Sequence, residues 1–216
     1  MSSHANYQQT YIDGWNQACR QLGLQPQPGA LQQLLEAHAA PDRHYHGLQH
    51  IAECLGWLAT CQGQVAWPAE LALALCFHDA VYDAQAKDNE LRSAQWAVQV
   101  LQTAGAKAQA VERVRALIMS TCHFQPQQGL PAEDTDWMLD IDLAILGAED
   151  ARFAEYEAQI QAEYAWVPAP LYAQKRAAVL RGFLQRPALY QTPHFHALLE
   201  KPARRNLRRA LGEPEE

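Results

Sequence analysis

The sequence predicts an all-α protein, and two observations support this fold class. Apolar residues recur at helical spacings of three and four along most of the 216 residues, and no segment alternates convincingly at period two. Prolines and glycines fall between these periodic segments, where they separate one helix from the next. In chain order, the expected helices cover about residues 5–22, 29–40, 44–61, 69–82, 89–104, 108–122, 134–146, 150–165, 170–186 and 201–211.

Composition and charge narrow the class of protein. With 49% apolar and 19% charged residues, the chain can bury a real core, and we expect one all-α domain over residues 1–216. Its net charge of −7 repels polyphosphate, so we expect no nucleic-acid partner. No apolar run approaches the roughly 18 to 20 residues of a membrane span. The polar first ten residues do not look like a signal peptide, and the five cysteines form no C-x-x-C pair. We therefore expect a cytoplasmic protein with reduced thiols and no membrane partner. The sequence leaves the oligomeric state undecided, and a homodimer is one of the alternatives.

The expected helix over residues 69–82 ends in ionisable residues. After Glu70 it is apolar on every side, which predicts a buried central helix, yet it ends with His78 and Asp79, and Asp83 follows one turn later. A buried carboxylate costs several kcal/mol unless a cation or hydrogen bonds compensate it. The alternative is a solvated helix end with a single His–Asp pair, and the dipeptide alone favours that alternative.

Two aspartates lie in the stretch from Trp137 to Leu146 of the expected helix over residues 134–146. Asp142 stands in the middle of an apolar stripe, whereas Asp140 lies about 200° away around the helix. The stripe consists of Met138, Leu139, Ile145 and Leu146. We therefore expect Asp142 to need a cation and Asp140 to lie on the surface.

The expected helix over residues 44–61 carries His46 and His50 one turn apart, along the edge of its apolar stripe. Such a pair can bind one metal jointly, or it can divide into a ligand and a general acid. Two ordinary polar residues at the edge of a core are an equally good interpretation of these histidines alone.

One divalent cation would account for four of these residues together. Two imidazoles and two carboxylates on three expected helices can surround a single ion, and mixed nitrogen and oxygen donors suit Mn²⁺, Fe²⁺, Zn²⁺, Ni²⁺ or, less well, Mg²⁺. No HExxH, Walker, G-x-S-x-G or EF-hand pattern competes with this interpretation. The predicted ligands are His50, His78, Asp79 and Asp142.

At these residues the chain resembles the HD-domain superfamily of metal-dependent phosphohydrolases, whose signature is H…HD…D. It is most similar to a group of small bacterial predicted HD hydrolases, over most of residues 43 to 190. The similar stretches are Tyr45 to Ile51, Phe77 to Asp83, Asp88 to Ala94, Asp140 to Gly147 and Tyr172 to Tyr190.

The resemblance implies roles for individual residues. His50, His78, Asp79 and Asp142 match the superfamily's metal ligands. The Tyr-His-x-x-x-His stretch is also similar to that of cyclic-nucleotide phosphodiesterases, and this similarity implies that His46 is the general acid. Asp83 matches an acidic position that serves catalysis in alarmone-hydrolysing relatives. Apart from the resemblance, Arg43 adjoins the site helix and is a candidate for holding phosphate.

We therefore expect a hydrolase that acts on a small phosphate ester or nucleotide with about one divalent metal ion per chain. One alternative is a non-catalytic signalling module that binds a metal or a nucleotide. A less favoured alternative is a di-iron oxygenase, which needs further histidines between the HD pair and the last aspartate. The chain offers only His123 in that interval. This residue could touch substrate or hold a second metal ion, and an ordinary histidine at the C-terminus of a helix is an equally good interpretation.

Overall fold

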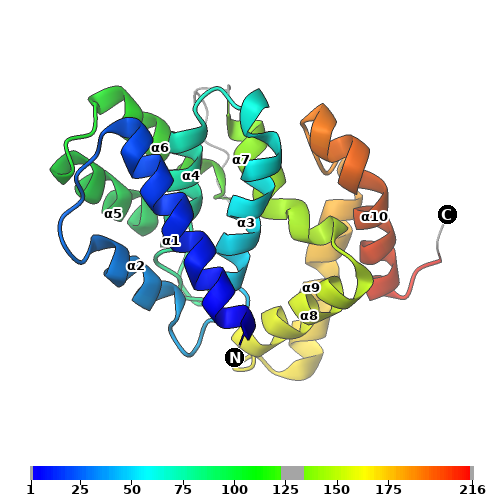
Figure 1. Cartoon of the computed structure of the whole chain (residues 1–216). Helices are drawn as coiled ribbons and strands as arrows, with labels where there is room; N and C mark the ends of the chain where they lie inside the picture. The colour runs from blue at the N-terminus through cyan, green and yellow to red at the C-terminus, as the bar shows by residue number, and fades with distance from the viewer. Residues whose placement is uncertain (1, 123–133, 215–216) are drawn as a thin grey trace. The chain divides into compact units, whose positions relative to one another are not determined.

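Helices make up all the regular secondary structure in residues 2–122 and 134–214, which are the residues that the computed structural model describes (Figure 1). This confirms the all-α fold class. None of the described helices is both long enough and apolar enough to cross a membrane. The α-helices are α1 (Ser2–Leu22), α2 (Ala30–His38), α3 (Leu48–Cys61), α4 (Pro68–Phe77), α5 (Asn89–Thr103), α6 (Ala108–Ser120), α7 (Thr135–Asp142), α8 (Asp150–Glu163), α9 (Ala169–Leu184) and α10 (Pro193–Leu211), with short 3₁₀ helices η1 (Gln62–Gln64) and η2 (Leu143–Gly147).

The chain divides into two compact units, Met1–Leu139 and Asp140–Glu216. The first contains α1 to α6 and most of α7, and the second contains η2, α8, α9 and α10. The expectation of one domain over residues 1–216 stays a prediction.

Helix α4 lies at the centre of the first unit, as its sequence predicts. Every residue from Ala69 to Phe77 is buried, and α1, α3, α5 and α6 all pack against this helix (Figure 1). Its one charged residue, Glu70, is buried but paired with the guanidinium of Arg113, whose Nη2 donates to Oε1 at 2.8 Å. Arg113 also stacks over the ring of Trp67, 4.0 Å from the centroid. Helix α4, which ends one residue before His78, is therefore held by four neighbouring helices.

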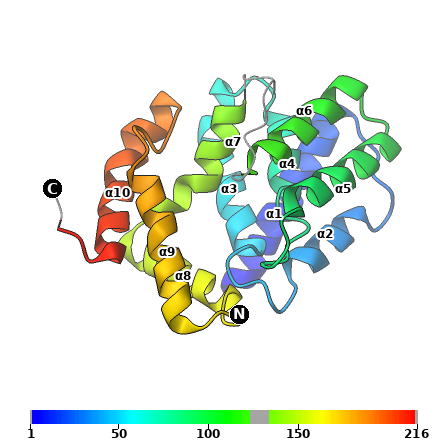
Figure 2. The same ribbon diagram turned by 180° about the vertical axis from the view of Figure 1, so that it is seen from behind.

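In the second unit, α10 packs on α9 and on η2 (Figure 2). Its start is tied to Asp140, whose carboxylate accepts the backbone N–H groups of Gln191 and Thr192 and the hydroxyl of Thr192 at 2.7 to 3.1 Å. Thr192 in turn caps α10 by accepting the N–H of Phe195. The expectation that Asp140 lies on the surface is therefore wrong, because this residue is 1% exposed and is held by hydrogen bonds.

Helix α10 is longer than the sequence predicts. We expected it to begin near residue 201, with Pro193 and Pro202 as breakers, but it begins at Pro193 and continues through Pro202. Proline is well tolerated in the first turn of a helix, since the N–H that it lacks has no helical partner there. Pro193 therefore starts this helix.

Candidate metal centre

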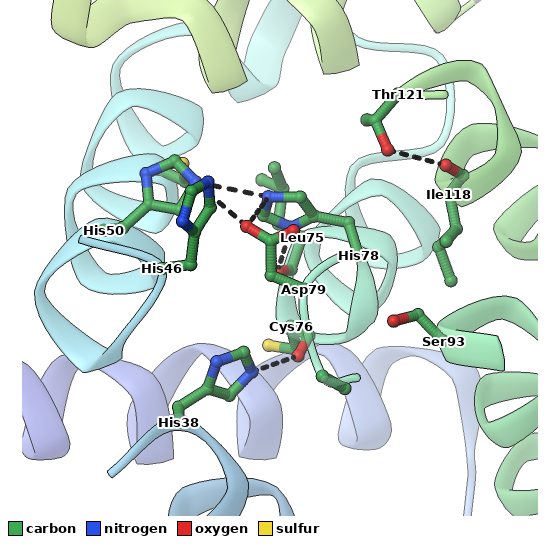
Figure 3. A network of polar contacts seen from close by, with 12 residues as sticks. His38, His46, His50, Leu75, Cys76, His78, Asp79, Ser93, Ile118 and Thr121 are labelled. Atoms are coloured by element: carbon green, nitrogen blue, oxygen red, sulfur yellow. Dashed lines mark hydrogen bonds and ion pairs between the residues drawn. The ribbon is translucent and has the colours of Figure 1, made fainter. Parts of the chain in front are cut away.

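Three side chains of the first unit converge at the end of the central helix. His50 lies in the first turn of α3, and His78 and Asp79 directly follow α4. The two Nε2 atoms of the histidines are 3.2 Å apart, and Asp79 Oδ2 lies 3.0 Å from Nε2 of His78 and 3.6 Å from Nε2 of His50. Figure 3 shows both rings beside the Asp79 carboxylate, and the His50 and His78 rings are edge-on to one another. Both histidines are 2% exposed and Asp79 is 17% exposed, so two buried imidazoles and a half-buried carboxylate gather at this point.

The hydrogen bonds of His78 fit the role of a ligand. Its Nδ1 lies 2.9 Å from the carbonyl oxygen of Leu75, and because a carbonyl only accepts, Nδ1 carries the proton. In the neutral ring, Nε2 then presents a lone pair toward His50. Metal-binding histidines usually donate their second ring N–H in this way. Two nitrogens bound to one ion at about 2.1 Å would lie about 3.0 to 3.4 Å apart, which is the observed spacing.

The electrostatics of the group favour an ionised carboxylate. Burial alone would raise the pKa of Asp79, but His78 first, and then His46 and His50, outweigh it and hold the pKa of Asp79 well below its usual range. Asp79 is therefore ionised beside the two imidazoles, and a carboxylate must be ionised to bind a metal ion.

His46 does not lie on the same helix as His50, contrary to the expected helix over residues 44–61. Helix α3 begins only at Leu48, because the N–H of Gly47 turns back to the carbonyl of Tyr45 at 2.7 Å and places His46 at the centre of a tight turn. The ring of His46 stacks on that of Tyr82, with centroids 4.1 Å apart, and lies edge-on to His50 at 6.2 Å. His46 thus lies next to the group (Figure 3).

The guanidinium of Arg43 is directed at the backbone around the group. It donates to the carbonyl oxygens of His46 at 3.2 Å, of Ala80 at 2.9 Å and, in a very short contact, of Asp79. The side chain of His38 lies behind it, with Nδ1 3.4 Å from Nη1 of Arg43. The sequence analysis did not single out His38. This histidine is the last residue of α2, and only 2% of it is exposed.

Asp83 lies apart from this group in its contacts. We expected the helix to run to residue 82, with Asp83 one turn after Asp79, but α4 ends at Phe77 and residues 78–88 form turns. The Asp83 side chain is exposed and accepts the N–H of Gln85 at 2.8 Å, while its backbone pairs with the amide of Asn89. Its catalytic role stays a prediction.

Two further residues from the sequence analysis have different outcomes. Asp142 is the last residue of α7 and is half-buried in the second unit, where it acts electrostatically on Tyr156. His123 lies outside the described residues. Of the five cysteines, four are buried and Cys122 is half-buried, all as free thiols.

No protein-family model, curated protein or solved structure matches the chain. We therefore base its function on the side chains themselves.

Proposed function

We propose that the chain is a metal-dependent phosphohydrolase of the HD type, acting on a small phosphate ester or nucleotide. The observation that supports this proposal is the buried group of His50, His78 and Asp79, whose donor atoms have the spacing of ligands to one ion. Without an ion, two imidazoles and a carboxylate would be an expensive set of groups to bury.

We assign the fourth ligand position to Asp142. Its carboxylate would complete the set of two imidazoles and two carboxylates that the sequence predicts. Asp140, its neighbour in α7, already accepts hydrogen bonds from the start of α10. The mixed nitrogen and oxygen donors favour Mn²⁺, Fe²⁺, Zn²⁺ or Ni²⁺ over Mg²⁺, and we expect about one ion per chain.

A bound divalent cation supplies positive charge that polarises a phosphate ester and lowers the pKa of water from about 16 towards about 7. The chain's own residues supply the rest of the chemistry. The ionised Asp79 orients a water molecule as a hydrogen-bond acceptor. His46, held against Tyr82 at the side of the group, donates a proton to the leaving oxygen.

The test is a combined metal and activity assay on the full chain. Protein loaded in turn with Mn²⁺, Ni²⁺, Zn²⁺ and Mg²⁺ would be analysed for metal content and screened against phosphomonoesters, nucleotides and cyclic nucleotides. We expect about one ion per chain and hydrolysis of at least one substrate class. His50→Ala should remove both, whereas the exposed histidine variant His196→Ala should retain both.

Each of the other possible results of this assay would indicate a different function for the chain. One bound ion without hydrolysis of any substrate class would indicate a non-catalytic binding module. Two ions per chain would favour a di-iron oxygenase. A folded protein that binds no metal under any loading condition would overturn the site itself.

A further inference from the structure

Arg43 connects the two backbone segments that carry the candidate metal centre. One segment is the tight turn before α3, which presents His46 and leads into the helix with His50. The other is the turn after α4, which presents Asp79. The guanidinium donates to a carbonyl oxygen of each segment, at His46 and at Asp79, and to Ala80 as well. It thereby occupies carbonyl groups that, after the end of α4, do not continue a helix.

These bonds fix the directions of side chains through their backbone. A side chain's direction follows from the dihedral angles of its own residue, and a carbonyl held by a charged donor cannot rotate freely. The planar guanidinium offers five donors in a fixed fork, which lets one side chain hold several carbonyls at once. An ammonium group carries the same charge but not this geometry.

The side chain of His38 supports Arg43 from behind. Its Nε2 lies 3.1 Å from the carbonyl oxygen of Cys76, so this nitrogen must carry the proton. In the neutral ring, Nδ1 is then an acceptor, and it faces Nη1 of Arg43 at 3.4 Å. Burial, and next the charge of Arg43, lower the pKa of His38 to about 3 and so favour the neutral ring. The hydroxyl of Tyr11 donates to the same Cys76 carbonyl at 2.8 Å and completes the support.

We propose that Arg43 is a positioning residue of the metal centre, held in place by His38, and that it sets the geometry of the ligands rather than binding phosphate. The proposal rests on the metal centre of the proposed function. It replaces the sequence-based expectation that Arg43 holds phosphate, because a phosphate group would have to compete with the backbone carbonyls that this guanidinium already holds.

The test uses Co²⁺ as the probe, since its visible absorption reports the number and arrangement of its ligands. The full chain and the variants Arg43→Lys, Arg43→Ala and His38→Phe would be titrated with Co²⁺ after metal removal. Arg115→Ala is the matched control, because Arg115 is an exposed arginine of the same unit paired with Glu112. All proteins would be compared by circular dichroism at a temperature well below their thermal midpoints.

We expect both Arg43 variants to bind Co²⁺ about 10- to 100-fold more weakly, with altered band positions, as is typical when a residue that orients ligands is removed. Arg43→Lys should not restore the spectrum, whereas soluble guanidinium ion at millimolar concentration should restore part of it in Arg43→Ala. His38→Phe should change the spectrum in the same direction, and Arg115→Ala should leave it unchanged. Should Arg43→Ala fail to fold, Arg43→Lys still decides the question.

Three results separate this inference from its rivals. Unchanged Co²⁺ affinity and spectrum in Arg43→Lys would overturn the inference. If that variant instead lost inhibition by inorganic phosphate or showed only a raised KM, Arg43 would be a phosphate ligand. If the wild-type chain bound Co²⁺ normally but hydrolysed no substrate, the proposed function would be overturned. The comparison of Co²⁺ binding among the variants would still test the role of Arg43.

Discussion

His46 and His50 are four residues apart in the chain, but their rings have different neighbours. The ring of His50 points its Nε2 at His78, inside the candidate metal centre, whereas the ring of His46 stacks on Tyr82. Stacking on Tyr82 holds the His46 imidazole in one orientation. This arrangement suits a proton donor that acts beside a metal ion.

We predict that His46→Ala retains the metal but slows hydrolysis by a factor of about 10² to 10⁴, the usual cost of losing a general acid. The loss should be largest for alkyl phosphates and smaller for nitrophenyl esters, whose leaving group needs little protonation. Steady-state rates on both substrate types, with metal analysis in parallel, check this. Tyr82→Phe keeps the stacked ring and serves as the control. Loss of metal from His46→Ala would show that His46 is a ligand instead.

His38 makes the stability of the protein depend on pH. Its pKa is lowered to about 3 in the folded chain, chiefly by burial, and is about 6.5 when unfolded. Between these values only the unfolded chain takes up the proton, so the stability that His38 contributes is complete above about pH 6.5 and declines as the pH falls towards 3. The slope from this one residue approaches about 1.4 kcal/mol per pH unit.

We therefore predict that His38→Gln is less stable than the wild type at pH 7, because it loses well-placed hydrogen bonds, but loses less stability on acidification. Urea unfolding of both proteins at pH 7, 6 and 5, with a chelator present, measures the difference in slope. If the free energy of unfolding fell equally steeply with pH in both proteins, His38 would be protonated in the folded chain.

At the scale of elements, two aspartates in the second half of α7 have different tasks. Asp140 anchors the start of α10 by accepting hydrogen bonds from two backbone N–H groups and a hydroxyl. Asp142, two residues later, is the proposed ligand. The residues are chemically identical, so the elements around them determine their roles.

We predict opposite effects of the two conservative variants. Asp140→Asn places an amide among N–H donors, and leaving such groups unsatisfied costs about 1 to 3 kcal/mol of stability, with metal content unchanged. Asp142→Asn should instead lower the metal content and lose the part of the thermal stability that depends on metal. Elemental analysis and thermal unfolding with and without chelator distinguish the two variants. A loss of metal from Asp140→Asn alone would reverse the assignment.

For the whole molecule, the sequence predicts where the helices lie much better than where they end. The pattern of apolar residues extends over many positions, so the buried helix α4 could be located from its amino-acid sequence alone. The ends of helices depend on single tertiary hydrogen bonds. The turn that displaces His46 from α3 and the carbonyls that Arg43 holds after α4 involve backbone atoms, which every residue has and no sequence pattern marks.

The residues of the candidate site likewise divide into those that the sequence predicts and those that it does not. His50, His78 and Asp79 could be predicted because each is an unusual residue for an apolar helix, and the structure brings these three together. Asp140 was misplaced because angular position on one helix says nothing about the N–H groups that a later segment brings to it. His38 was missed since its partner atoms are a backbone carbonyl and an arginine.

A bound ion should stabilise the whole chain, since an ion that binds only the folded state shifts the unfolding equilibrium. At a free metal concentration 100 times Kd this effect is about 2.7 kcal/mol, and for a chain of this length each kcal/mol raises the thermal midpoint by about 2 to 4 °C. We therefore predict that Mn²⁺ or Ni²⁺ raises the midpoint by about 5 to 10 °C and that a chelator reverses the rise. His50→Ala should show no metal response, and the exposed variant His196→Ala should respond like the wild type. Calorimetric or fluorescence melting of the three proteins checks this, and an equal metal response in His50→Ala would place the ion elsewhere in the molecule.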